Sequence, residues 1–169
     1  VITTSGSINS DGTARALALN ASGTGGQVLV EGAVGNTAAL GALTLNASAM
    51  QVNGGSVTTT GNQTYTGAVT LAGNGTLTGT SPATLTTTAG ITGAGNNLTL
   101  NFPTVDVGST ITGVANSYIV NITGIDIDEA CEVKSTWNAA VCRGDIGRMN
   151  VGGGGGAVVG VLATRHETR

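Results

Sequence analysis

The sequence predicts an all-β protein, a parallel β-helix (β-solenoid) of about four to five coils, and three observations support this. Strings of one pattern recur along the chain, apolar residues alternate with polar ones, and β-branched residues are frequent. Only 9% of the 169 residues are charged and 2% are aromatic, whereas average domains contain roughly 25% charged residues. A hydrophobic content of 40% with a net charge of −3 argues against disorder, which needs low hydrophobicity and high charge.

The repeat is visible in four strings of nearly even spacing. They are ALALN (16–20), ALTLN (42–46), AVTLA (68–72) and NLTLN (97–101). Each string places two apolar residues two positions apart, which is the period of a strand with one buried face. These residues form the predicted repeat core: Leu17, Leu19, Leu43, Leu45, Val69, Leu71, Leu98 and Leu100.

Further strands are predicted after each string. A second alternating pair occurs at Met50/Val52 and at Val105/Val107. In the copy that begins at residue 68, Thr76 and Thr78 take these places with Leu77 between them, so we expect a β-bulge or a one-residue register change that returns Leu77 to the inner face. A third strand per coil is predicted from a last set of apolar positions: Val57, Leu85, Ile91 and Ile111.

The physical basis of this fold is that one coil cannot bury its own inward side chains, whereas stacked coils bury a continuous apolar column. We expect almost no helix before residue 125, because β-branched residues lose rotamer freedom in helices. Asn20, Asn46 and Asn101 close three of the four strings. They are interpreted either as an aligned ladder of side chains or as ordinary turn residues.

The distribution of charge indicates a boundary near Gly124. Residues 1–105 contain only Asp11, Arg15 and Glu31 as charged residues, whereas residues 124–150 hold most of the acids, both cysteines and the only Trp. We therefore expect β-solenoid repeats at 1–124, a Cys-containing cap segment at 125–150, and a Gly-rich linker with a tail strand at 151–169.

Cys131 and Cys142 are predicted to form a disulfide that pins the cap segment. By the chain-entropy estimate this bond would stabilise the fold by about 3 kcal/mol. Two cysteines and the lone His166 do not supply the four ligands of a structural zinc site. No metal and no cofactor are predicted.

Aromatic and acidic residues near the end of the repeats have two interpretations. Trp137 and Tyr118, with Phe102 and Met149, either form a platform for a ligand or plug the open end of the solenoid. Asp126 and Asp128 share one face of a strand and either bind calcium or face solvent, although the glycine-spaced pattern of a calcium loop is missing. Because the first four coils contain no pair of carboxylates, we assign no catalytic residue and predict that the protein is not an enzyme.

The composition also limits the kinds of partner that this protein can bind. A weakly acidic chain has no basic patch for phosphates, so we expect no binding to nucleic acid. No apolar run approaches the roughly 20 residues of a membrane-spanning helix, so we expect no membrane insertion. The first residue is Val1 and no signal peptide is recognisable, so any secretion signal is expected outside this sequence.

The stretch ALTLNASAMQVNGGSVTTTGNQTYTGAVTLAGNGTLTGT (42–80) resembles the passenger repeats of bacterial filamentous-haemagglutinin-type exoproteins and autotransporter adhesins. The resemblance covers about residues 1–124 and lies in degenerate LxLN and GxVTTTGxQTYxG strings. It implies a right-handed parallel β-helix, export across the outer membrane, and a role in adhesion, aggregation or biofilm. The Asn-Pro-Asn-Gly-type secretion motif of such exoproteins is not found near the start of this sequence.

Two functions remain in competition on these grounds. The first is an extracellular structural or adhesive β-solenoid of a bacterial cell surface, either a stalk or a filament subunit whose partner is itself, end to end. Host or matrix glycans are further candidate partners. The second is a carbohydrate-binding or polysaccharide-cleaving module with its site at Trp137, Tyr118, Asp126 and Asp128.

Overall fold

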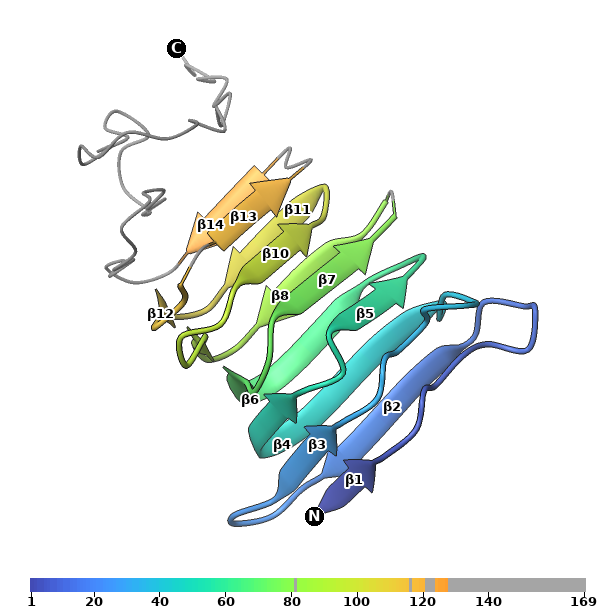
Figure 1. Cartoon of the computed structure of the whole chain (residues 1–169), viewed down its shortest axis with the longest axis horizontal. Helices are drawn as coiled ribbons and strands as arrows, with labels where there is room; N and C mark the ends of the chain where they lie inside the picture. Colours follow the sequence, from blue (N-terminus) through green and yellow to red (C-terminus); the bar gives the residue numbers. More distant parts are fainter. Residues whose placement is uncertain (81, 116, 121–123, 128–169) are drawn as a thin grey trace.

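A computed structural model describes residues 1–80 and 82–115 and the backbone of residues 117–120 and 124–127. This part of the chain contains fourteen β-strands and no helix. The strands are β1 (Ile2–Thr4), β2 (Ala16–Ala21), β3 (Gln27–Val30), β4 (Ala42–Val52), β5 (Ser56–Thr59), β6 (Gln63–Leu71), β7 (Gly75–Gly79), β8 (Thr84–Thr87), β9 (Ile91–Thr92), β10 (Leu98–Asn101), β11 (Thr104–Val107), β12 (Ile111–Thr112), β13 (Ser117–Val120) and β14 (Gly124–Ile127). They form a parallel β-solenoid of about five turns, which confirms the predicted fold class (Figure 1).

The strands belong to two sheets. A ten-stranded sheet follows the order β1-β3-β4-β6-β8-β11-β14, with β2 beside β4, β9 beside β6 and β12 beside β9. A four-stranded sheet has the order β13-β10-β7-β5, and in Figure 1 it is drawn in front of the longer sheet. Neighbouring strands come from successive coils, as stacking of a repeated unit requires.

The coils differ in length. The first coil runs from Leu17 to its in-register partner Leu43. The next coils are shorter and run from Leu43 to Gln63 and from Gln63 to Leu85. The coil after these, from Leu85 to Val105, is again shorter than the first. The spacing of the first two repeated strings therefore describes the first coil only.

The four repeated strings do not share one position in the coil, which corrects the sequence alignment. ALALN (16–20) does lie beside ALTLN (42–46). The string AVTLA (68–72), however, lies beside the second half of β4, where Val69 pairs with Met50. The string NLTLN (97–101) lies in the four-stranded sheet, where Leu100 pairs with Leu77. The strings match because each is a strand with one inward face, and this alternation is common to every face of the solenoid.

The predicted bulge at Thr76–Thr78 is wrong. Leu77 already faces inward, because β7 pairs without interruption with β5 and β10. The register shift lies elsewhere, between Asn46 and Ala49 of β4, where two residues of β4 face one residue of β6. The shift is visible in β4 itself, where the buried apolar residues change from odd positions at Leu43 and Leu45 to even positions at Met50 and Val52.

The inward side chains of both sheets form one hydrophobic core. Strand β4 shows the alternation plainly, with Leu43, Leu45, Ala47, Met50 and Val52 buried and the other residues between them more exposed. The other predicted core residues Val69, Leu71, Leu98 and Leu100 are also buried, whereas Leu17 and Leu19 are only partly buried. The core continues through the coils as a column, so that each coil covers the next.

A small polar cluster lies inside this core. Gln63 is fully buried, and its Nε2 donates to Thr59 Oγ1 at 3.2 Å and to the carbonyl oxygen of Thr78 at 3.0 Å. Tyr65 OH donates to Gln63 Oε1 at 2.7 Å, and burial raises the pKa of the Tyr65 phenol above its usual value. Because the buried polar groups are paired with one another, their desolvation is compensated.

Phe102 is fully buried, so its ring is not available to a ligand platform. The ring occupies space that a side chain at Gly79 would fill, since a Cβ there would lie 2.3 Å from Phe102 Cε1. The alternative prediction, an end plug with Tyr118, Trp137 and Met149, depends on side chains that lie outside the described residues.

Aligned Asn positions extend over two coils only, and no hydrogen bond joins the side chains of Asn20 and Asn46. Asn20 and Asn46 are in-register neighbours, but the next partner of Asn46 is Thr66. Asn101 lies in the other sheet, beside Thr78. All three Asn residues lie near strand ends, but they do not stack on one another in successive coils.

Candidate functional site

The first coil lies at one end of the described stack of coils. Within the described chain, β1 pairs only with β3 and β2 pairs only with β4. Figure 1 shows both strands at one end of the stack, with β13 and β14 at the other. An unpaired strand edge presents N–H and C=O groups that can pair with another chain. We call the outer side of β1 and β2 the N-terminal edge.

Inward side chains of the first coil are less buried than those of the coils that follow. The apolar residues in question are only partly buried: Ile2, Ile8, Leu17, Leu19 and Ala21. By contrast, Leu43 and Leu45, the in-register partners of Leu17 and Leu19, are each 1% exposed. The difference arises because an inner coil is covered on both sides, whereas the first coil is covered on one.

The N-terminal edge lacks the features that usually protect an edge strand. Strands β1 and β2 read ITT and ALALNA, so they contain no charged residue and no proline. Thr4 Oγ1 is buried and has no hydrogen-bond partner among the described residues. A buried hydroxyl without a partner is unfavourable, and this group lies in the strand that ends the sheet.

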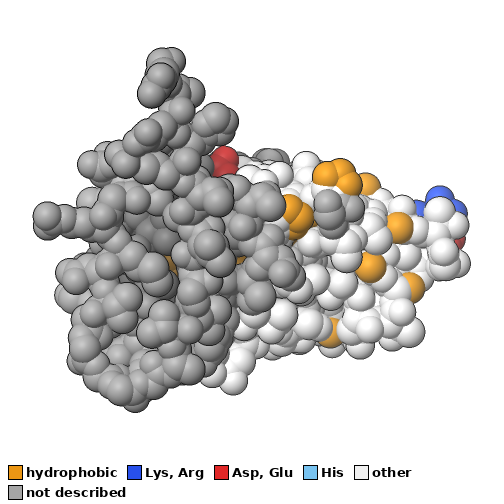
Figure 2. Space-filling model, turned by 90° about the horizontal axis from the view of Figure 1, so that it is seen from above, with side chains coloured by type: hydrophobic (Ala, Val, Ile, Leu, Met, Phe, Trp, Pro, Cys, Tyr) orange, Lys and Arg blue, Asp and Glu red, His pale blue; other side chains and the backbone are white. Residues whose placement is uncertain are grey.

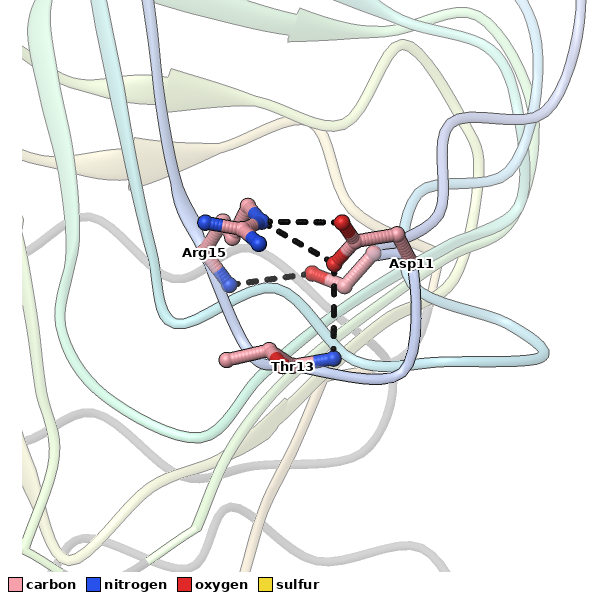
Figure 3. Close-up of polar contacts among 4 residues, drawn as sticks. Asp11, Thr13 and Arg15 are labelled. Carbon is pink, nitrogen blue, oxygen red and sulfur yellow. Dashed lines mark hydrogen bonds and ion pairs between the residues drawn. The ribbon is translucent and has the colours of Figure 1, made fainter.

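An ion pair lies in the loop before β2 (Figure 3). Arg15 Nε donates to the two carboxylate oxygens of Asp11 at 2.9 and 3.1 Å. The Asp11 carboxylate also accepts from the backbone N–H of Thr13, and Ser10 Oγ accepts from that of Arg15. The hydrogen bond from Arg15 is the main cause that lowers the pKa of Asp11. Both side chains are exposed, so the pair adds little to stability, and it carries no net charge.

A second feature is a groove at the corner between the two halves of β4 and β6, which we call the corner groove. It has a volume of about 330 Å³ and is open to solvent. Four successive coils line it, through residues 21–23, 46–48, 66–67 and 88. With coils spaced by about 4.8 Å, three spacings give a length of about 14 Å. The groove therefore runs across the strands, along the stacking direction.

Local backbone features shape this groove. It contains the register shift of β4, in which Ala47 and Ser48 oppose the single residue Gly67 of β6. Gly67 has φ +125°, and a Cβ at this position would lie 1.9 Å from the carbonyl oxygen of Ala47. Only glycine fits, because other residues rarely adopt this φ and their Cβ would clash. Bulges of this kind are frequent next to binding sites.

The groove offers polar groups without charge. Ser48 Oγ donates to the carbonyl oxygen of Gly23 at 3.2 Å, and Thr88 Oγ1 accepts from the Gly67 N–H at 3.1 Å. By contrast, the side chains of Ser22, Asn46 and Thr66 form no hydrogen bond with another described residue. The groove thus has two hydroxyls and one amide group available to a ligand, and its lining contains no charged and no aromatic residue.

The described surface is nearly free of charge. The charged residues within the described ranges are Asp11, Arg15, Glu31, Asp106 and Asp126. Threonines take many of the outward positions, and Thr44, Thr64 and Thr86 lie side by side in successive coils. In Figure 2 the described part of one face is mostly white, with red and blue at few places. A ligand of this surface would be recognised by hydrogen bonds rather than by charge.

The predicted ligand or cap residues lie at the far end of the described chain or beyond it. Tyr118 lies in β13 and pairs with Thr99 in the four-stranded sheet, whereas Asp126 lies in β14 and pairs with Asp106 in the other sheet. Trp137, Asp128, Cys131 and Cys142 fall outside the described residues. The structure thus places Tyr118 and Asp126 on different sheets.

Among the described residues, no group of three or more His, Cys, Asp or Glu side chains could hold a metal ion. This part of the chain also contains no helix that is long and apolar enough to cross a membrane. Comparison with known proteins gives no match to any family model, curated protein or solved structure.

Proposed function

We propose that this chain is an extracellular structural and adhesive β-solenoid of a bacterial cell surface, which acts as a stalk or as a self-assembling filament subunit. Adhesion, aggregation or biofilm formation would follow from its surface. The N-terminal edge is the single observation that carries the proposal, because it combines unpaired strands, partly exposed apolar residues and an absence of protecting charges.

The partner proposed for this edge is the opposite end of a second copy. Inside the molecule, a coil is what covers a coil: β4 covers β2 and β3 covers β1. The last described coil has strands of the same kind, with Ile125 and Ile127 of β14 in the column that begins with Leu17 and Leu19. The two ends differ, so their contact is heterologous, and a heterologous contact that does not close forms a fibre.

Electron microscopy of the purified full-length chain, with light scattering on the same sample, tests this proposal. We expect narrow filaments of uniform width. Leu19→Lys should convert them to short single rods, because a charge would replace an apolar side chain at the edge. Thr76→Lys is the matched control, since Thr76 is an exposed residue of an inner coil, and it should leave filaments unchanged. Circular dichroism should show the same β content in all three proteins.

Two results would overturn the assembly proposal. One is a monodisperse monomer at all concentrations of the wild-type chain. The other is filaments that persist in the Leu19→Lys variant while its β-structure is retained. If that variant loses its structure, Leu17→Thr offers a milder change at the same edge, with fewer and shorter filaments expected.

We also propose that Cys131 and Cys142 form a disulfide in the cap segment. The composition and the inferred extracellular location support it, because disulfides persist in oxidising compartments. Mass spectrometry of an unreduced proteolytic digest should show the two peptides linked. Free thiols in protein purified without reductant would contradict the bond.

A further inference from the structure

We infer that the corner groove binds an uncharged polysaccharide chain that lies along the stacking direction of the coils. The inference names a class of ligand for the proposed adhesive role. It depends on that proposed role only for its biological meaning. The groove itself is defined by residues of four successive coils and does not depend on assembly.

The direction of the groove excludes a peptide strand as its ligand. A peptide that adds to a sheet lies parallel to the strands and pairs with a free main-chain edge. The corner groove crosses the strands, and its middle coils are already paired on both sides, as β4 is by β2 and β6. A linear ligand in this groove would therefore meet side chains and isolated backbone groups, not a sheet edge.

The polar groups in the groove suit hydroxyl groups. Asn46 offers two amide donors and a carbonyl acceptor, and the hydroxyls of Ser22 and Thr66 each donate and accept. None of these three side chains is bonded to another described residue, so they are available without breaking a contact. Asn46 and Thr66 are in-register neighbours, so they repeat along the groove at about 4.8 Å.

The remaining lining leaves room for a sugar ring. The side chains of Ala21 and Ala47 face the core, and Gly67 has no side chain, so none of these three residues projects a side chain into the groove. The register shift at Ala47–Ser48 and the φ of Gly67 together keep this space open. An open floor beside free hydrogen-bonding groups accommodates a chain that is rich in hydroxyl groups.

The uncharged lining of the groove favours neutral polysaccharides over acidic ones. The groove contains no Lys or Arg to pair with a carboxylate or sulfate, and a charge that is desolvated without a partner is costly. The absence of aromatic residues from the lining also removes stacking, so binding at one groove should be weak. In a filament or on a cell surface, many grooves would raise the avidity without any new contact.

Affinity electrophoresis in native gels tests the inference. The full-length chain is run through gels that contain a neutral polysaccharide (a soluble β-glucan, an α-glucan or a mannan) or an acidic one (alginate). We expect retardation by at least one neutral polysaccharide and none by alginate. Retardation should be the same at low and at high salt concentration, because screening acts only on charged contacts.

Variants assign the effect to the groove. Asn46→Leu combined with Thr66→Val removes polar groups at nearly constant volume, and retardation should fall at least tenfold. The control Thr76→Val makes the same kind of change on the four-stranded sheet and should bind as the wild type does. Equal melting temperatures would show that the fold is kept.

Three outcomes would overturn the inference: no retardation by any neutral polysaccharide, unchanged binding by the Asn46/Thr66 variant, or binding to alginate that salt abolishes. The same gels run with Leu19→Lys separate this inference from the assembly proposal. If single rods are retarded, the groove binds polysaccharide even though filaments do not form. If filaments form but are not retarded, only the assembly proposal is supported.

Discussion

The first coil and the inner coils share one residue pattern but differ in what surrounds it. Leu17 and Leu19 of the first coil stand directly beside Leu43 and Leu45, yet only the second pair is buried on all sides. The inward face of a strand in this fold is therefore completed by the neighbouring coils, not by its own sequence. The same residue pattern is closed core in one coil and a partly exposed surface in the other.

Truncation of equivalent leucines gives the largest expected contrast. Leu45→Ala should lower the free energy of unfolding by about 2–5 kcal/mol, because it leaves a cavity in a closed core. Leu19→Ala removes the same atoms from the partly open coil and should cost about 1 kcal/mol or less. Urea unfolding of unassembled protein measures both. Equal losses would mean that the first coil is as well packed as the second.

Glycine substitutions give the next contrast. Gly79→Ala should destabilise by about 1–3 kcal/mol, because the new Cβ would overlap the buried Phe102 ring. Gly6→Ala, in the first coil, meets no atom within 4 Å and should leave the unfolding midpoint almost unchanged. Thermal melts followed by circular dichroism compare the two. A neutral Gly79→Ala would show that the ring can shift without cost.

The polar cluster of the inner coils supplies a smaller effect. Tyr65→Phe removes the hydroxyl that donates to Gln63 Oε1 and leaves this buried acceptor without that donor. The expected loss is about 1–3 kcal/mol, the cost of an unsatisfied buried group. Urea denaturation at neutral pH measures it. Gln63→Leu together with Tyr65→Phe also removes the donor to Thr59 Oγ1 and to the Thr78 carbonyl oxygen, so it should be at least as harmful as Tyr65→Phe alone.

Alkaline pH should weaken the wild type through the same phenol. Burial raises the pKa of Tyr65 in the folded state, whereas an unfolded Tyr ionises near pH 10. Stability from this group is therefore fully present below about pH 10 and is lost as pH rises above it. Unfolding midpoints between pH 8 and 11 should fall less steeply in Tyr65→Phe. Parallel curves would exclude Tyr65 as the source.

The ion pair beside the edge should matter least. Asp11→Asn removes the exposed carboxylate that Arg15 contacts, and the melting temperature should not change measurably, because exposed pairs are solvated and screened. The pKa of Asp11 is lowered in the folded state. Any stabilisation by this pair is therefore present at pH values above the usual pKa of Asp and is lost as the pH falls into the acid range. A clear drop in melting temperature at pH 7 would show that the loop supports β2.

Much of the scaffold could be predicted from single strings, but their relation to one another could not. Alternation alone identified the buried members of β4, β6 and β10, since a strand with one buried face has a period of two. It could not separate the faces of the solenoid, because Val69/Leu71 and Leu98/Leu100 show the same pattern in different sheets. Which strands lie side by side depends on the length of each coil, and this length varies because the loops between strands differ in length.

Apart from the change from odd to even positions in β4, the corner groove had no signal in the alternation. Its lining is made of small and polar residues that are typical of turns anywhere in the chain. A trace of it exists in the spacing, because β4 has Ala47 and Ser48 where β6 has only Gly67. That difference becomes visible only when the correct strands are aligned.

Local alternation and β-propensity were enough to specify the fold class, the strand content and the apolar positions. The folded chain was needed to show which strings share a column, where the register shifts, and that Phe102 fills the space left by Gly79. It was also needed to show which apolar coil is left uncovered. The physical reason is that burial in a solenoid depends on contacts between successive coils, which lie far apart along the chain, and no local pattern specifies those contacts.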